Sequence, residues 1–363
     1  NIMENVEWLP PERIPDLSDA KEIAIDLETH DPGIKTKGPG WARNEGKVIG
    51  VAVAVEGWKG YFPVAHEGGG NFDENFFKKI LDLPCDKVFH NSSYDVGWLR
   101  QWGLETKGRI IDTMIAAPLI DENRTSQGKN YSLNDLAKEY LGERKKEDEL
   151  YSKALEHGVD PKGEMHLLPA MVVGPYAEKD AELTLKLWNV FKPEIIKQEL
   201  HNIFNLETDL LPLLIDIKWK GVRVDLEKAD QIKKDLAKKE KSILQKIKKD
   251  TGVNVEIWAA SSVAKAFDSV GLSYSRTEKT NAPSFHKQFL VNHSHDLPKM
   301  IVNAREINKA RTTFIDSILR HEHKGRIHAD INQLKTETGG TVSGRLSMQH
   351  PNLQQIPARH PEL

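Results

Sequence analysis

Residues 22–28 read Glu-Ile-Ala-Ile-Asp-Leu-Glu, a short apolar run that ends in two acidic side chains. An apolar run of this length is typical of a buried β-strand. Side chains two positions apart on a strand point to the same side, so Asp26 and Glu28 can face one site. Acidic pairs at strand ends are common, however, and this pair alone indicates little. Its meaning depends on the residues that fold beside it.

Strand-like and helix-like segments alternate through the first half of the chain. The expected strands cover residues 22–27, 48–55, 58–63, 87–90 and 110–112. The expected helices cover residues 72–81, 94–101, 114–120, 133–141 and 176–191. This alternation predicts an α/β domain over residues 1–191, with a mixed sheet covered by helices.

Beyond residue 191 the pattern becomes mainly helical. The expected helices there cover residues 193–218, 226–249 and 303–315. The second of them has one apolar and one lysine-rich face, which in most proteins is simply a solvated surface. From Arg326 onward the chain is polar and rich in glycine. We therefore expect a helical domain over residues 192–325 and a third segment over residues 326–363.

The amino-acid composition limits the classes of protein to which this chain can belong. Of 363 residues, 51 are Lys or Arg and 54 are Asp or Glu, so the formal net charge is only -3. Any surface that binds nucleic acid must therefore be local. Cys85 is the only cysteine, which excludes an intrachain disulfide and favours a reducing compartment such as the cytoplasm. The sequence has no run of about 18 apolar residues, so we expect no membrane-spanning helix.

Two further acidic groups lie where the expected elements could bring them beside the first strand. Asp95 ends the sequence Asn-Ser-Ser-Tyr-Asp at a strand-to-helix junction, although an acid in the first turn also stabilises the helix itself. Tyr176 and Asp180 are four positions apart in an expected helix and therefore share one face. Carboxylate oxygens are the ligands that hard divalent ions such as Mg²⁺ and Mn²⁺ prefer.

The three groups together suit one chemistry. Asp26, Glu28, Asp95 and Asp180 could hold two divalent ions about 3.5–4 Å apart. One ion would activate a water as nucleophile, and the other would stabilise the leaving 3′ oxygen and the charge on the phosphate. Tyr176 would orient the water rather than remove its proton, because a phenol with a pKa of about 10 is a poor base at neutral pH. The set predicts phosphodiester hydrolysis.

The order D-x-E, N-x-x-Y-D, Y-x-x-x-D resembles the tyrosine-containing branch of the DEDD superfamily of 3′-to-5′ exonucleases, over about residues 20–191. The stretches 111–117 and 132–137 are also similar to that family. The resemblance implies a ribonuclease H-like mixed sheet. It also implies roles for the residues that match the motifs: Asp26, Glu28, Asp95 and Asp180 as metal ligands, and Tyr176 beside the attacking water.

Three neighbouring residues have open assignments. Asn91 and Ser92 would contact DNA or brace the site, and Ser92 could equally cap the helix that follows it. His66 is expected to be structural or close to the substrate rather than a metal ligand.

Residues 341–357, Thr-Val-Ser-Gly-Arg-Leu-Ser-Met-Gln-His-Pro-Asn-Leu-Gln-Gln-Ile-Pro, resemble the signature T-x-x-G-R-L-S…P-N-L-Q-x-I-P of family A DNA polymerases. The resemblance implies that the lysine-rich helix 226–249 belongs to a thumb that grips the primer-template duplex. It also implies a set of DNA-binding residues: Lys309, Arg311 and Thr312 near the DNA backbone, and Arg345, Asn352 and Gln354 near the synthesis site. In that family the metal-binding aspartates of the palm and the fingers helix follow this signature. We therefore expect the polymerase active site to be absent from these residues.

Our leading hypothesis is the proofreading exonuclease and DNA-gripping part of a family A DNA polymerase, active in DNA replication in the bacterial cytoplasm and encoded by a phage or a bacterium. Its partners would be single-stranded DNA 3′ ends and the primer-template duplex. The rest of the polymerase would be carried by a second chain, or be missing through truncation or proteolysis. One alternative is an RNA-trimming exonuclease of the same superfamily. Another is a catalytically idle subunit that clamps DNA for a separate polymerase chain.

Overall fold

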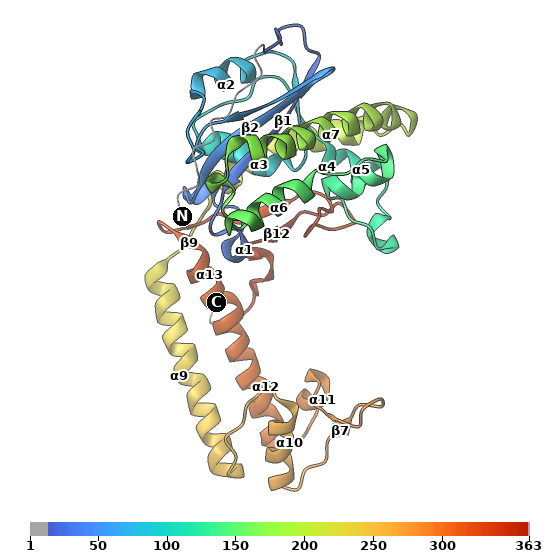
Figure 1. The fold of residues 1–363 in the computed structure, drawn as a ribbon. Helices are drawn as coiled ribbons and strands as arrows, with labels where there is room; N and C mark the ends of the chain where they lie inside the picture. Colours follow the sequence, from blue (N-terminus) through green and yellow to red (C-terminus); the bar gives the residue numbers. More distant parts are fainter. Residues whose placement is uncertain (1–13, 362–363) are drawn as a thin grey trace. The chain divides into compact units, whose positions relative to one another are not determined.

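The computed structural model describes residues 14–361. Within this range the chain forms two compact units (Figure 1). The first unit runs to Gly221 and includes the later segment His328–Asn352. The second comprises Val222–Ile327 and the residues from Leu353 onward. No helix within residues 14–361 is both long and apolar enough to cross a membrane.

A five-stranded mixed sheet forms the centre of the first unit (Figure 1). In order across the sheet, its strands are β3 (Trp58–Pro63), β2 (Lys47–Val55), β1 (Glu22–His30), β4 (Asp86–Phe89) and β5 (Ile110–Asp112). β1 pairs antiparallel with β2 and parallel with β4. The residues of β2 are almost all apolar and buried, which is typical of a strand covered on both faces. The mixed α/β sheet predicted from the alternating pattern is confirmed.

Helices pack against this sheet. α7 (Ala170–Lys197) contacts β1, β2 and β3, while α3 (Ser92–Gln101) lies beside β2 and β5. The unit's other elements are α1 (Ile34–Lys37), η1 (Trp41–Arg43), α2 (Glu74–Leu81), α4 (Thr113–Ile120), η2 (Arg124–Gln127), α5 (Leu133–Leu141), α6 (Glu147–His157), η3 (Met165–Leu167), α8 (His201–Lys220) and the antiparallel pair β11 (Asp330–Asn332) and β12 (Ser347–Gln349).

The pairing of β1 with β2 contains an irregularity beside the acidic pair. Glu28 lies opposite Gly50, and the register shifts between Glu28 and Thr29. Such a bulge re-aims the side chains next to it. A larger residue than Gly50 would require Tyr61 to move, because a Cβ there would lie only 1.9 Å from the buried Tyr61 hydroxyl. The close approach of Tyr61 therefore fixes β2 against β3 at the point where Glu28 sits.

α7 extends further than the sequence pattern indicates. We expected one helix to end at residue 191 and another to start at Pro193, but Pro193 lies inside α7, which ends at Lys197. Phe191 and Ile195, one turn apart, are both buried in the core. Their burial outweighs the hydrogen bond that the proline removes. The limit expected at residue 191 therefore falls within a helix. The limit expected between the helical domain and the third segment, at residues 325 and 326, stays a prediction.

Long helices dominate the second unit. Its helical elements are α9 (Leu226–Thr251), α10 (Ala260–Ser269), α11 (Lys287–Val291), α12 (Asp296–Lys309), the π-helical turn η4 (Ala310–Ile315), α13 (Asp316–His321) and η5 (Leu353–Gln355). Its short strands are β6 (Val222–Arg223), β7 (Ser275–Arg276), β8 (Pro283–Ser284), β9 (Glu322–His323) and β10 (Arg326–Ile327).

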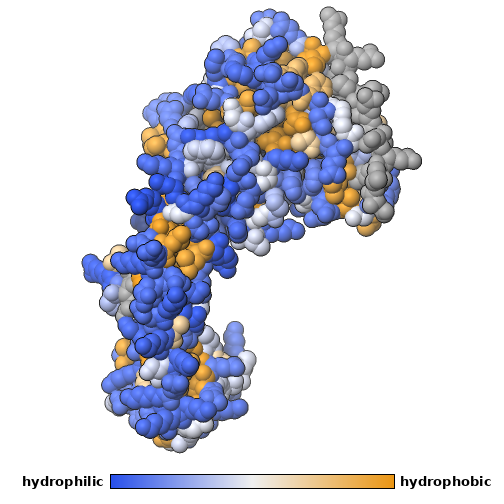
Figure 2. Space-filling model, turned by 90° about the vertical axis from the view of Figure 1, so that its left-hand side faces the viewer, coloured by the Kyte–Doolittle hydropathy of each residue, from blue (hydrophilic) through white to orange (hydrophobic). Residues whose placement is uncertain are grey.

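α9 and α12 lie side by side in this unit (Figure 1). The side chain of Asp225 caps α9 by accepting the Lys228 N–H at 3.0 Å. Leu236 and Ile247 of α9 are fully buried, whereas its lysines are mostly exposed. Figure 2, a view from the side of α9, shows a mainly hydrophilic surface over this helix. The two-faced pattern predicted for residues 226–249 is thus present in the structure.

Candidate metal centre

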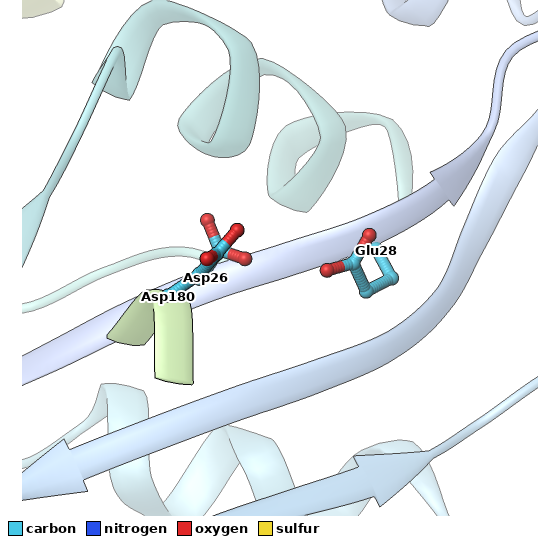
Figure 3. A group of neighbouring side chains, drawn as sticks. All are labelled: Asp26, Glu28 and Asp180. Carbon is cyan, nitrogen blue, oxygen red and sulfur yellow. The ribbon is translucent and has the colours of Figure 1, made fainter. Parts of the chain in front are cut away.

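Three carboxylates from distant parts of the sequence converge in the first unit (Figure 3). Asp26 and Glu28 project from β1, and Asp180 reaches them from α7. One oxygen of each lies within 4.8 Å of the others. The spacing of two on a strand brings the first pair to one side, as predicted, and the packing of α7 on β1 supplies the third acid.

Asp95 lies beside this cluster, on α3. Its Oδ1 accepts the backbone N–H of Leu27, the residue between the two acids of β1, at 2.8 Å. The Asp95 side chain is only 4% exposed. The structure therefore fastens the fourth predicted carboxylate to the strand that carries Asp26 and Glu28, next to the compact group of three.

The four carboxyl groups share a buried environment that disfavours their charged forms. Burial raises the pKa of Asp26 to about 8, and the charge of Asp180 adds to this rise. Burial raises the pKa of Asp180 to about 6. For Glu28 and Asp95, burial and then the charge of Asp26 raise the pKa well above its ordinary value. Crowded, buried carboxylates of this kind are stabilised in their ionised form by a nearby cation.

The donor set fits hard divalent ions. Every group in the cluster offers carboxylate oxygen, which such ions prefer. Asp180 Oδ1 is buried and finds no hydrogen-bond partner among residues 14–361. A buried polar atom without a partner is costly, and a coordinated ion would remove that cost. The residues present are therefore suited to hold divalent metal.

Tyr176 lies one turn before Asp180 on α7, as its spacing predicts. Burial raises the pKa of the Tyr176 phenol well above its ordinary value, and the charge of Asp180 contributes. The hydroxyl therefore keeps its proton across the physiological range. Its partner is Lys145, whose Nζ donates to the Tyr176 hydroxyl at 3.0 Å.

Lys145 is the functional candidate that the sequence did not reveal. Its Nζ also lies 2.7 Å from Asp180 Oδ2. It stands in Arg144-Lys145-Lys146, and nothing in the spacing of these residues distinguishes one cation from the next. Only the fold places this lysine, which is 17% exposed, at the carboxylates.

The residues around the start of α3 are held by Asp112. Its carboxylate accepts the N–H groups of Asn91 and Ser92, at 3.0 and 2.8 Å, and the Ser92 hydroxyl at 2.6 Å. Ser92 is fully buried, and its side chain braces the turn rather than capping α3. Asn91 adopts a left-handed conformation with φ 67° and lines a cavity of about 470 Å³ with Ser93 and Tyr94.

His66 follows β3 in the chain and is buried, with only 3% of its surface exposed. Its Nε2 lies 2.6 Å from the Tyr61 hydroxyl, and its Nδ1 lies 2.9 Å from the Leu168 carbonyl oxygen. Both ring nitrogens therefore have protein partners, which suits a structural role. His66 does not belong to the three-residue group around Asp26.

The six DNA-binding residues predicted from the polymerase signature are carried by elements other than β1, α3 and α7. Lys309 ends α12, and Thr312 lies in η4, both exposed. Arg311 is engaged within the second unit, because its Nη2 donates to Glu240 Oε2 at 3.0 Å. The remaining three are exposed: Arg345 in the segment between β11 and β12, Asn352 after β12, and Gln354 in η5.

Comparisons with known proteins match both parts of the chain. Residues 9–196 match the family described as 3′-5′ exonuclease, and residues 226–363 match DNA polymerase family A. A DNA-directed DNA polymerase of Pseudomonas phage M6 is 35% identical over 97% of this chain and 56% of its own length. DNA polymerase DpoZ of Salmonella phage PMBT28 is 31% identical over 96% of this chain and 57% of its own length.

More distant matches extend to bacteria and to a solved structure. DNA polymerase I of Pseudomonas aeruginosa is 27% identical over 95% of this chain and 38% of its own length. The POL domain of Pol1 from M. smegmatis, solved with DNA primer-template and dNTP, has a TM-score of 0.71 at 19% identity and covers 95% of this chain. That likeness concerns the fold. The chain spans only about half the length of the phage relatives.

Proposed function

Because the chain belongs to DNA polymerase family A and carries its 3′-5′ exonuclease domain, we propose that it removes nucleotides from DNA 3′ ends by hydrolysing phosphodiester bonds. One observation supports the proposal more strongly than the others do. Asp26, Glu28 and Asp180 present carboxylate oxygens within 4.8 Å of one another, with Glu28 and Asp180 buried and Asp26 half-buried. A family match without this convergence would leave the chemistry unsupported.

Asp26, Glu28, Asp95 and Asp180 would hold the divalent ions. When bound, two such ions supply a nucleophile by lowering the pKa of water, and they offset the charge of the reacting phosphate and the leaving 3′ oxygen. Mg²⁺ is the ion we propose for the cell, and Mn²⁺ is its substitute in vitro. Glu28, Asp95 and Asp180 are buried and Asp26 is half-buried, which limits the access of competing water to the reacting bond.

Tyr176 would hold the attacking water by a hydrogen bond. Because burial raises the pKa of the phenol, its hydroxyl remains a donor and does not act as a base. Asn91, in its left-handed conformation at the start of α3, would contact the single-stranded DNA that enters the site.

The substrate we propose is DNA rather than RNA, because residues 226–363 match a DNA polymerase family. The complete protein would act as a DNA-directed DNA polymerase in replication in the bacterial cytoplasm, with a second chain as a candidate partner. Lys309, Arg311, Thr312, Arg345, Asn352 and Gln354 would contact the primer-template duplex. Phosphate contacts of this kind position the duplex without reading its sequence.

The decisive experiment follows a 5′-labelled single-stranded DNA and a matched RNA in Mg²⁺. We expect stepwise shortening of the DNA from its 3′ end and loss of this activity in Asp26→Ala with Glu28→Ala. The control is the exposed pair Asp148→Ala with Glu149→Ala on α6, which should leave the rate unchanged. Shortening that persists in the first double variant would contradict the metal assignment. Faster shortening of the RNA would favour the RNA-trimming alternative.

A further inference from the structure

The ammonium group of Lys145 occupies a defined position at the acidic cluster. Its Nζ lies 2.7 Å from Asp180 Oδ2 and 3.0 Å from the Tyr176 hydroxyl oxygen. The same nitrogen lies 4.9 Å from the centroid of the Tyr176 ring. Glu147 is further away, at 3.9 Å. Lys145 thus contacts both functional residues of α7 at once.

Hydrogen bonds hold the segment that presents this lysine. The segment joins α5 to α6, and the Lys145 N–H donates to Asn134 Oδ1 of α5 at 3.1 Å. On its other side, Glu143 accepts Lys179 and Lys186 of α7 at 2.8 and 3.0 Å. Asn134 lies in the stretch 132–137 that resembles the exonuclease family. The segment is therefore attached to both neighbouring helices, and Lys145 needs little reorganisation to keep its contacts.

The two oxygens of Asp180 have different surroundings. Oδ2 accepts Lys145, whereas Oδ1 is buried without a partner among the described residues. Oδ1 thus remains available to an ion while Oδ2 stays with the lysine. The contact to Tyr176 has a similar consequence. A phenol oxygen that accepts a bond from Lys145 keeps its own O–H as a donor to another group.

We propose that Lys145 is a positioning residue of the nuclease site: it directs the Tyr176 O–H toward the attacking water and holds Asp180 Oδ2, which leaves Oδ1 for an ion. This inference rests on the proposed exonuclease function. Lys145 acts through Tyr176 and Asp180 and takes no proton from the reacting water. A buried ammonium that accompanied the acids only for charge balance would not need the second bond to the phenol.

The test compares Lys145→Met with Lys145→Arg, each alone and combined with Tyr176→Phe. Lys146→Met serves as a matched control, because Lys146 is the adjacent lysine and is exposed. Lys145→Gln provides a second neutral variant should the methionine prevent folding, which thermal unfolding in Mn²⁺ will reveal. Each protein is assayed for kcat and KM on single-stranded DNA, and its Mn²⁺ affinity is measured by calorimetry without DNA.

We expect Lys145→Met to lower kcat by about 10- to 100-fold, as for other residues that orient the groups of a metal site, with little change in KM. Lys145→Arg should restore part of the loss. In the Tyr176→Phe background the same change should cost much less, because the two residues act as a unit. Mn²⁺ affinity should not weaken, since the lysine is not a ligand and its charge opposes the cation.

Three results would overturn the inference: an unchanged kcat in the neutral variants, a loss that saturating Mn²⁺ restores, or equal losses in the presence and absence of the Tyr176 hydroxyl. These results differ from failure of the proposed function. If the unmodified chain does not shorten DNA in Mn²⁺, the exonuclease assignment fails. If the chain is active and its kcat does not depend on Lys145, only the positioning role is overturned.

Discussion

Asp95 accepts the backbone N–H of Leu27 at 2.8 Å, so α3 is bonded to β1 between the two acids that β1 contributes. The bond is buried and joins residues 68 positions apart in the sequence. Asp95 thus has a structural contact in addition to its proposed metal-binding role. These two roles can be separated by substitution, because an amide oxygen can accept the same N–H without carrying a charge.

Asp95→Asn should therefore preserve the fold and abolish most of the nuclease activity. Asp95→Ala should lose the activity and also destabilise the chain by about 1–3 kcal/mol, because the Leu27 N–H is left unpaired. Urea unfolding in EDTA measures the stability difference, and shortening of labelled DNA in Mg²⁺ measures the activity. An active asparagine variant would remove Asp95 from the proposed ligand set.

Stability without metal should fall as the pH rises. Burial raises the pKa of Asp26 to about 8 in the folded chain, whereas an unfolded aspartate has a pKa of about 3.9. Between these values the folded state holds a proton that the unfolded state has released. The free energy of unfolding must therefore decrease as the pH rises through this window. The raised pKa values of Glu28, Asp95 and Asp180 act in the same direction.

Urea titrations in EDTA at about pH 5 and about pH 8.5 measure this linkage. Asp26→Asn should reduce the difference between the two conditions, while Asp148→Asn, at an exposed position on α6, should not. Added Mn²⁺ should restore stability at the higher pH, because ligands bind metal in their ionised form. A chain equally stable in both conditions without metal would show that the acids are not buried together.

Much of the site could be predicted from local periodicity. A period of two on β1 aligned Asp26 with Glu28, and a spacing of four on α7 aligned Tyr176 with Asp180. Lys145 could not be found in this way, because its position depends on how the segment between α5 and α6 lies on α7. The continuation of α7 through Pro193 has a similar origin. Local propensity favours a break there, and burial of Phe191 and Ile195 overrides it.

Gly50→Ala should weaken both the fold and the site. The new Cβ would meet the Tyr61 hydroxyl at 1.9 Å, and Tyr61 is buried and paired with His66. Overpacking of this kind typically costs about 1–3 kcal/mol. Because Glu28 lies opposite Gly50, the displacement should also reduce nuclease activity. The melting temperature and the rate of DNA shortening should both fall in this variant. A variant with unaltered melting would show that Tyr61 can move aside.

Substitution of Arg311 and substitution of Lys309 should have different effects on the melting temperature, although both residues are predicted to contact DNA. Arg311 donates to Glu240 Oε2 at 3.0 Å, and Asn308 donates to the other oxygen of Glu240 at 2.9 Å. Glu240 is only 8% exposed. Removal of the guanidinium would leave this carboxylate poorly paired between α9 and α12, and a buried charge that loses its partner is strongly destabilising. Arg311→Ala should therefore lower the melting temperature, and Glu240→Gln in the same chain should recover part of that loss.

Lys309→Ala, at an exposed position, should leave the melting temperature unchanged and weaken binding to a primer-template duplex. Loss of one phosphate contact should also reduce the slope of log affinity against log salt by about 1. Fluorescence anisotropy over a series of salt concentrations measures both quantities. Unaltered affinity and slope in Lys309→Ala would remove this residue from the DNA-binding set. A stable Arg311→Ala with reduced affinity would instead mean that Arg311 exchanges Glu240 for a phosphate when DNA binds.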